Sequence, residues 1–255
     1  MSYSSAQSVT ITSAANPLYK KINSLRHGRG IRKHGLFIAG GKKILDEITD
    51  KSPEILKYLV VSKSFADTLP VNKGLTVLSN ELFNELNEIG LPEPLAVVEA
   101  PVFPEFDPSS KWEPGINLFL PFGDPENVGA AIRSATGLGV ARIILLRESA
   151  NPLLPRAVRA SAGTVLNAPV ESGPSLEDLK IPDNIPFFAL DSKGIPLDTI
   201  EPPDTFAVVA GSEGTGIPET LKRVTRLVSI PLSNDVESLN AAASVSILLW
   251  EWRRK

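Results

Sequence analysis

The length, composition and charge of this chain exclude several classes of protein. Its 255 residues are enough for one large domain or two modest ones with buried cores. Hydrophobic residues make up 42% and charged residues 22%, which is ordinary for a globular protein and argues against disorder or a fibrous repeat. The absence of cysteine excludes disulfides, thiolate metal sites and a cysteine nucleophile, and it fits the cytoplasm, where we expect the protein to act.

The start of the chain carries no targeting signal, but it is strongly basic. The first twelve residues lack the basic start and the apolar core of a signal peptide, so we expect no export. No later stretch reaches ~18 apolar residues, so we expect no membrane span. Residues 1–45 contain eight Lys and Arg and no Asp or Glu, although the net charge of the chain is −3. A run of charge is usually a solvated face, but unopposed cations favour phosphate binding, because counterion release rewards such clusters. His27 and His34 are too few to predict a zinc site, and we predict no metal.

In chain order, the first predicted elements are those of a small α/β domain. Apolar runs predict strands at 36–39, 56–61 and 95–98, and helical patterns lie at 42–49 and 80–89. Residues 100–115 contain four prolines among Asp, Ser and Gly, which suit neither a helix nor a central strand. We therefore place an interdomain linker at 101–115, between domains at 1–100 and 116–255.

The predicted elements of the second domain indicate a parallel sheet. Short apolar runs lie at 116–120, 142–146, 186–190, 206–210 and 227–232, separated by helical segments. Continuous apolar strands bounded by helices are typical of a sheet covered on both faces. The last segment, 238–255, has apolar and small residues at helical spacing.

Three polar segments follow predicted strands in this domain. Asp124 can cap a helix that starts with Pro125, contains Asn127 and Arg133, and ends at Gly139. Taken alone, this stretch also fits a capped surface helix with a solvated arginine.

The second and third segments are loops. Gly211-Ser212-Glu213-Gly214-Thr215-Gly216 lies where strand 206–210 ends, and its glycines let the backbone approach a ligand. Its spacing is neither the dinucleotide fingerprint nor the P-loop, although a glycine-rich turn without a ligand remains an alternative. Glu237-Ser238-Leu239-Asn240 opens the last helix, where Ser238 or Asn240 is either a cap or a ligand group.

Together, in this order and spacing, the three segments resemble the motifs of the SpoU (TrmH-like) RNA ribose 2′-O-methyltransferases. Ala157-Val158-Arg159-Ala160-Ser161-Ala162-Gly163 is similar to the middle segment of that family. Asn16-Pro17-Leu18-Tyr19-Lys20-Lys21 resembles its N-terminal RNA-binding domain. The resemblance implies an α/β chain with an L30e-like N-terminal domain and a C-terminal SPOUT domain, whose parallel sheet carries a trefoil knot.

The same resemblance implies a homodimer that methylates RNA with S-adenosylmethionine, and ribosomal RNA is preferred over transfer RNA as the expected substrate. The catalytic residues carried over are Arg133, Asn127, Glu213, Ser238 and Asn240. The cofactor-binding residues are Ala210, Gly211, Ser212, Glu213, Gly214, Gly216, Ile230, Leu232, Ser238 and Leu239. The expected RNA-binding residues are Lys20, Lys21, Arg26, Arg29, Arg32 and Lys33.

The chemistry is an in-line displacement in which a hydroxyl oxygen attacks a methyl group, so positioning supplies much of the rate. The resemblance implies that Arg133 acts as a base. A guanidinium group, however, has a pKa above ~12, which favours the role of a clamp that orients the ribose. A methylation at pyrimidine C5 normally needs a cysteine, which this chain lacks. Two alternatives remain: an RNA-binding or ribosome-assembly protein that has lost turnover, and an enzyme that binds a nucleotide on a doubly wound sheet.

Overall fold

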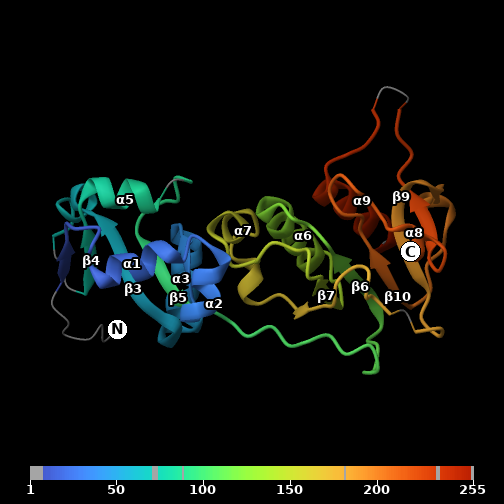
Figure 1. Cartoon of the computed structure of the whole chain (residues 1–255), viewed down its shortest axis with the longest axis horizontal. Helices are drawn as coiled ribbons and strands as arrows, with labels where there is room; N and C mark the ends of the chain where they lie inside the picture. Colours follow the sequence, from blue (N-terminus) through green and yellow to red (C-terminus); the bar gives the residue numbers. More distant parts are fainter. Residues whose placement is uncertain (1–7, 71–73, 88, 181, 234–235, 254–255) are drawn as a thin grey trace. The chain divides into compact units, whose positions relative to one another are not determined.

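Two β-sheets organise the chain. The computed structural model describes residues 8–70, 74–87, 89–180, 182–233 and 236–253. Its contacts define one unit made of Met1–Pro101 with Leu153–Arg159, and another made of Val102–Pro152 with Ala160–Lys255 (Figure 1). No helix within the described ranges is long and apolar enough to cross a membrane.

The first unit contains a mixed five-stranded sheet with the strand order β1-β4-β3-β5-β2. Strands β1, β4 and β3 run parallel, whereas β5 runs antiparallel to both of its neighbours, β3 and β2. The strands are β1 (Val9–Ile11), β2 (Leu36–Gly40), β3 (Leu56–Ser62), β4 (Leu75–Leu78) and β5 (Leu95–Glu99). The helices are α1 (Pro17–Ser24), α2 (Gly28–His34), α3 (Lys42–Lys51), α4 (Lys63–Ala66) and α5 (Asn80–Leu86), with a 3₁₀ turn η1 (Pro53–Ile55).

Helices α1 and α5 cover one face of this sheet with apolar side chains. The Asn16 side chain caps α1 by accepting hydrogen bonds from the Leu18 and Tyr19 N–H groups, at 2.8 and 3.3 Å. Tyr19 belongs to the same buried cluster as Leu82 of α5. The three predicted strands are present, but the helix predicted to reach residue 89 ends at Leu86. It ends there because the Asn87 side chain donates to the Leu91 carbonyl oxygen and accepts from the Leu91 N–H, at 2.8 Å each. These two bonds stabilise a turn in place of a further helical turn.

The second unit contains a six-stranded sheet in which every pairing is parallel, in the order β11-β9-β10-β6-β7-β8. The prediction of a parallel sheet is therefore confirmed. Its strands are β6 (Gly115–Leu120), β7 (Arg142–Leu145), β8 (Val170–Ser172), β9 (Phe187–Pro196), β10 (Thr205–Val209) and β11 (Arg226–Ser229). Its helices are α6 (Pro125–Gly137), α8 (Glu219–Lys222) and α9 (Ala241–Arg253), with 3₁₀ turns η2 (Thr164–Leu166) and η3 (Leu197–Thr199). Helix α7 (Pro155–Ala160) belongs, except for Ala160, to the first unit.

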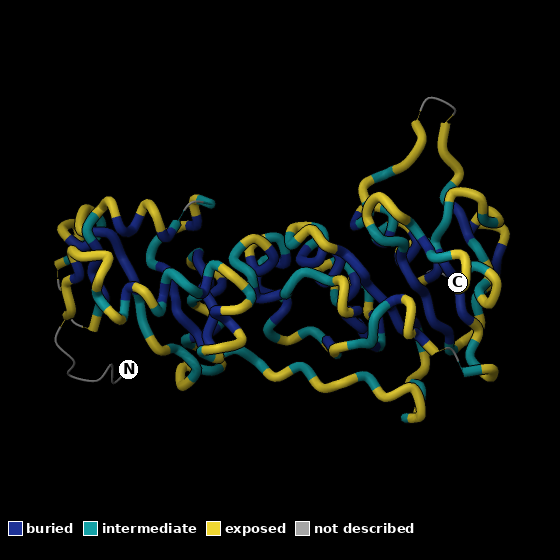
Figure 2. Tube along the Cα trace, viewed as in Figure 1, coloured by how far each residue is buried: buried dark blue, intermediate teal, exposed yellow. Residues whose placement is uncertain are grey.

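Both faces of this sheet are buried, as the continuous apolar runs predict (Figure 2). On one face, Trp252 of α9 packs against the rings of Phe188 and Phe206, with centroids at 4.9 and 5.3 Å. The Trp252 indole N–H donates to the Leu197 carbonyl oxygen at 3.1 Å, so its polar atom is also satisfied. The other face carries Phe119, which belongs to a second buried cluster.

Several boundaries in this unit differ from the prediction. Strand β9, predicted at 186–190, continues to Pro196 because Ile195 and Pro196 pair with β11 after a register shift. Helix α6, predicted to end at Gly139, ends at Gly137.

Strand β11 ends at Ser229 rather than at 232, and Pro231, which lacks a backbone N–H, follows within two residues. Helix α9 begins at Ala241 rather than at 238 because Asn240 caps it: the Asn240 side chain accepts from the Ala243 N–H at 3.1 Å. Residues 254 and 255 of the predicted last helix lie outside the described residues.

The proline-rich segment pairs with the edge of this sheet. Phe106 donates its N–H to the Ser172 carbonyl at 2.8 Å, and the Ser172 N–H donates to the Pro104 carbonyl at 2.8 Å. The Arg142 guanidinium lies 5.0 Å from the Phe106 ring and 5.9 Å from the Trp112 ring. The same guanidinium makes two hydrogen bonds of 2.7 Å to the Glu171 carboxylate on β8. These contacts make residues after Pro101 part of the second unit.

Candidate active site

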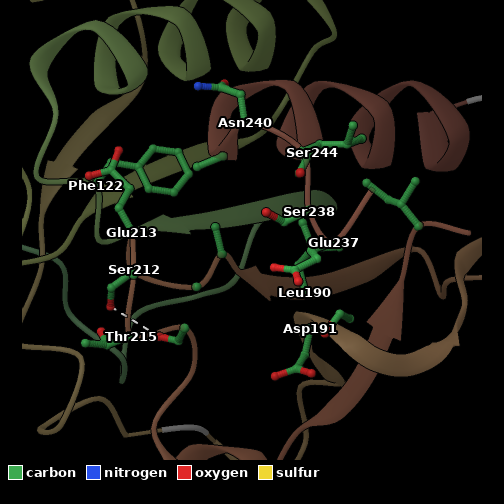
Figure 3. A pocket seen from close by; sticks show the side chains of 18 of the residues that line it. Phe122, Leu190, Asp191, Ser212, Glu213, Thr215, Glu237, Ser238, Asn240 and Ser244 are labelled. Atoms are coloured by element: carbon green, nitrogen blue, oxygen red, sulfur yellow. Dashed lines mark hydrogen bonds between the residues drawn. The ribbon is translucent and has the colours of Figure 1, made fainter. Parts of the chain in front are cut away.

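A cavity of about 690 Å³ lies in the second unit where several strands end. Its wall contains Phe122 after β6, Ala210 after β10, Ile230 after β11 and residues 190–193 of β9 (Figure 3). From β6 the chain continues to β7 on one side, whereas β10 pairs on the other side, so the strand order reverses here. Ligands of parallel sheets bind at such reversals, and the volume suits a small molecule.

The first polar segment forms the start of α6. The Asp124 side chain accepts the Glu126 N–H at 2.8 Å, and Pro125 occupies the first helical position, so the predicted cap is confirmed. This cap places Asn127 in the wall of the cavity.

The second polar segment is a tight loop after β10. Ser212 and Gly216 exchange two backbone hydrogen bonds, of 3.0 and 2.9 Å. Gly214 and Gly216 have φ values of +86° and +69°, which side chains rarely adopt. A Cβ on Gly211 would lie 3.1 Å from the Gly216 Cα, so the loop needs glycine here to close. The glycines therefore shape the wall of the cavity.

A hydrogen-bond network joins all three polar segments. The Glu213 carboxylate accepts the Gly123 and Asp124 N–H groups at 3.0 Å each and also accepts the Asn127 side-chain amide. The Asn127 amide oxygen in turn accepts the Asn240 side-chain amide at 2.8 Å. Figure 3 shows Glu213 and Asn240 around the same cavity. The network fixes two amide side chains at the cavity, where they can orient a polar substrate.

The structure places every predicted cofactor-binding residue in the wall of this cavity. They are Ala210, Gly211, Ser212, Glu213, Gly214, Gly216, Ile230, Leu232, Ser238 and Leu239. Four of the five predicted catalytic residues also line it: Asn127, Glu213, Ser238 and Asn240.

Arg133 is the predicted catalytic residue that this cavity does not include. Six residues after Asn127, it lies about 240° further around the helix axis, so it belongs to another face of α6. It is exposed, and among the described residues its side chain makes no hydrogen bond or ion pair. Its guanidinium is therefore available to a ligand or to another chain.

Sequence reasoning missed a charged pair in the cavity wall. The Asp191 carboxylate lies 3.1 Å from the Lys222 ammonium. Burial opposes ionisation, but the Lys193 N–H and the Lys222 ammonium outweigh it and hold the pKa of Asp191 below its ordinary value. A charged residue directly after the apolar run 186–190 was the available signal. In the described part of the chain, no three His, Asp or Glu side chains group together to hold a metal.

The basic segment forms a concave surface on α1 and α2 in the first unit. Four predicted RNA-binding residues line it, Lys20, Lys21, Arg29 and Lys33, whereas Arg26 and Arg32 do not. His27 and His34, which sequence reasoning considered only for a metal, also line this surface. Desolvation, followed by the charges of Lys33 and Lys21, lowers the pKa of His34. The positive charge of this surface therefore comes from its lysines and Arg29 rather than from His34.

Comparison with known proteins gives consistent relatives. Residues 118–250 match the model of the SpoU rRNA Methylase family. The ribosomal RNA small subunit methyltransferase G 2 of Syntrophobacter fumaroxidans is 36% identical over 96% of this chain and 49% of its own length, so this chain spans about half of that protein. The 23S rRNA (guanosine(2553)-2′-O)-methyltransferase RlmP of Bacillus subtilis is 27% identical over 95% of this chain and 98% of its own.

The fold has counterparts among solved structures. The AdoMet-bound rRNA methyltransferase from Sinorhizobium meliloti has a TM-score of 0.75 to this chain at 24% identity, with 98% of each chain covered. The predicted α/β fold with the parallel sheet of such methyltransferases is confirmed. The trefoil knot and the L30e-like character of the first unit stay predictions.

Proposed function

Because this chain belongs to the SpoU rRNA methylase family, we propose that it is an enzyme that transfers a methyl group from S-adenosylmethionine to a ribose 2′-hydroxyl of RNA. The observation that carries the proposal is the cavity in which Glu213, Asn127 and Asn240 join three segments of the chain. The relative from Bacillus subtilis, named for 2′-O methylation of 23S rRNA, supports ribosomal RNA as the substrate. We place the reaction in the cytoplasm, where bacterial ribosomal RNA is made.

The residues of the cavity fit this cofactor. Ile230, Leu232 and Leu239 offer apolar surface for an adenine ring. The glycine loop lets backbone groups approach the ligand, because Gly211, Gly214 and Gly216 line the cavity without side chains. When bound, the sulfonium supplies an electrophilic methyl group.

The protein contributes orientation. The Asn127 and Asn240 amides are held by the Glu213 network, and they can position the ribose so that its 2′-oxygen approaches in line. A guanidinium is a poor proton acceptor but a good bidentate donor, so we assign Arg133 the role of a clamp on the ribose and its phosphate rather than that of a base. As the oxygen–carbon bond would form and the carbon–sulfur bond would break, releasing S-adenosylhomocysteine, the hydroxyl group would give its proton to solvent.

We further propose that the enzyme is a homodimer in which Arg133 of each copy serves the cavity of the other. Arg133 is exposed and lies outside the cavity of its own chain. Ile247 and Trp250 on α9 are 40% and 50% exposed, which is high for large apolar side chains, and they suit a subunit interface. A partner would cover these side chains.

The function is tested with labelled S-adenosylmethionine and ribosomal RNA from a host that lacks the gene. We expect the wild type to label RNA at a ribose 2′-oxygen and to bind S-adenosylhomocysteine. Arg133→Ala should lose at least 100-fold in transfer while its affinity for S-adenosylhomocysteine changes less than about twofold. Arg223→Ala, which removes an exposed arginine outside the cavity, is the matched control.

A wild type that binds neither the cofactor nor its product, and labels no RNA, would refute this function. RNA binding without any transfer would instead favour the reading of a ribosome-assembly protein.

We also propose that the concave surface on α1 and α2 binds RNA phosphates. Replacing Lys20 and Lys33 by Ala should lower the slope of log K against log salt by about 1.4 to 1.8, since each lost phosphate contact removes about 0.7 to 0.9. The matched control replaces Lys42 and Lys43, which are equally basic and exposed but lie outside this surface. Equal slopes for the two double variants would contradict the assignment. Filter binding across a salt series measures both.

A further inference from the structure

The wall of the cavity contains an ion pair that the hydrogen-bond network of the three polar segments does not use. The side chains of Asp191 and Lys222 are 12% and 24% exposed, and both line the cavity. The Asp191 Oδ2 atom lies 3.1 Å from the Lys222 ammonium, and Oδ1 accepts the Lys193 N–H at 2.9 Å. A lysine and a backbone group therefore hold a carboxylate in place at the cavity.

This carboxylate can accept further hydrogen bonds. Each of its oxygens has two lone-pair sites, and the two contacts described occupy one on each oxygen. The carboxylate remains ionised because Lys193 and Lys222 outweigh the cost of its burial. A bound ligand with hydroxyl or N–H groups is the natural partner for the sites that remain.

The position of Asp191 in the cavity indicates which part of the ligand it contacts. In Figure 3, Asp191 and Asn240 lie at opposite ends of the cavity. Under the proposed function the reacting methyl group lies by Asn127 and Asn240, so Asp191 faces the cofactor from the opposite end of the cavity. Leu190, directly beside it, lines the same cavity with an apolar side chain. A group with hydrogen-bond donors on one side and carbon atoms on the other suits this end.

The charge of Lys222 helps to decide which polar group of the cofactor lies next to Asp191. Its α-ammonium would meet the Lys222 ammonium, which already neutralises Asp191 at 3.1 Å. Neutral hydroxyl groups meet no such repulsion, and a carboxylate that accepts from ribose hydroxyls is an established way of reading a nucleoside. We propose that Asp191 binds the ribose diol of the cofactor and is a specificity residue for it. This inference rests on the proposed function.

The test compares two ligands on each protein by isothermal titration. The ligands are S-adenosylhomocysteine and its 2′,3′-dideoxy analogue, which differ only in the diol. We expect the wild type to bind the natural ligand on the order of tenfold more tightly or better, because a hydrogen bond to a charged group is lost with the analogue. In Asp191→Ala this ratio should fall to below about twofold. Taking the ratio cancels any general loss of affinity caused by removing Asp191 from Lys222, which keeps the Glu219 carboxylate at 3.2 Å.

Asp183→Ala, which removes an exposed aspartate outside the cavity, should keep the wild-type ratio. Should Asp191→Ala fail to fold, Asp191→Asn, which keeps the size of the side chain, should still lower the ratio. Wild type that binds both ligands equally, or variants that keep its ratio, would overturn the assignment while leaving the proposed function intact. Wild type that binds neither ligand would overturn the cofactor, and the assignment with it.

Discussion

At the scale of single residues, Glu213 decides how the candidate site is assembled. Its carboxylate accepts two backbone N–H groups before α6 and the side-chain amide of Asn127. The side chain is exposed, so water competes for each of these bonds and they add little to stability. Their consequence is orientation, because one carboxylate holds both the start of α6 and the amide that faces the cavity.

Tyr19, also at the scale of single residues, is expected to make the free energy of unfolding depend on pH in alkaline solution. Its side chain is 1% exposed, and burial, with a hydrogen bond to Glu85 and the charge of Glu85, raises its pKa from 10.0 to about 12. An unfolded chain releases this proton near pH 10, whereas the folded chain keeps it until about pH 12. Tyr19 therefore contributes stability that is fully present below pH 10 and is lost as the pH rises towards 12.

We expect Tyr19→Phe to be no more stable than the wild type at pH 8. Its stability relative to the wild type should rise by about 1.4 kcal/mol between pH 8 and pH 11, since one pKa unit corresponds to that energy. Urea unfolding at the two pH values measures the change. Tyr58→Phe removes a phenol from a half-buried position on β3 and is the control. A relative stability that does not change with pH would show that the buried phenol ionises normally.

At the scale of elements, the proline-rich segment acts as an additional edge of the parallel sheet. We propose that the second domain begins near residue 102 rather than at 116, because Phe106 bonds the backbone of β8 and packs on Arg142 and Trp112. Phe106→Ala would remove a half-buried ring together with its cation–π contact. The expected loss in the free energy of unfolding is about 2 kcal/mol, less than for a fully buried phenylalanine.

Val102→Ala is the matched control, because Val102 lies in the same segment but is 92% exposed. It should change stability by less than about 0.5 kcal/mol. Urea unfolding followed by tryptophan fluorescence reports on both variants, since Trp112 packs on Phe106. If both variants lose equal stability, the segment is not an integral part of the second domain.

At the scale of the whole molecule, the exposed position of Arg133 predicts that two inactive variants can restore each other. Arg133→Ala keeps an intact cavity, whereas Glu213→Ala keeps the arginine. If Arg133 serves the cavity of a second copy, a mixed dimer contains one complete site, and an equal mixture should recover about a quarter of the wild-type activity. The measurement is methyl transfer after the two proteins are unfolded together and refolded.

The control for this experiment is each variant refolded alone, which should stay inactive. Ile247→Asp should abolish the recovery by preventing dimers, whereas Val224→Asp, at a valine that is 64% exposed elsewhere in the second unit, should not. Sedimentation velocity follows the oligomeric state of each variant. A mixture that stays inactive although it dimerises would place Arg133 in the site of its own chain.

The sequence by itself determined the parallel sheet and the three polar segments that contribute to the cavity wall. Apolar runs such as 206–210 are buried on both faces, and burial on both faces leaves a pattern that can be read without coordinates. Asp124, Gly214 and Gly216 were also readable, because a cap and a positive φ each demand particular residue types. Helix caps and tight turns depend on residues that are neighbours in the chain, so the sequence alone reveals them.

Only the tertiary structure decided which polar groups meet. Glu213 and Asn127 are 86 positions apart, Asn127 and Asn240 are 113 apart, and no local pattern records such a pair. The Asp191–Lys222 ion pair and the contact of the Phe106 ring with the Arg142 guanidinium likewise depend on the order of the strands in the sheet. A side chain's own preferences act over a few residues, whereas hydrogen bonds and ion pairs form between whatever groups the packing of the sheet brings within about 3 Å.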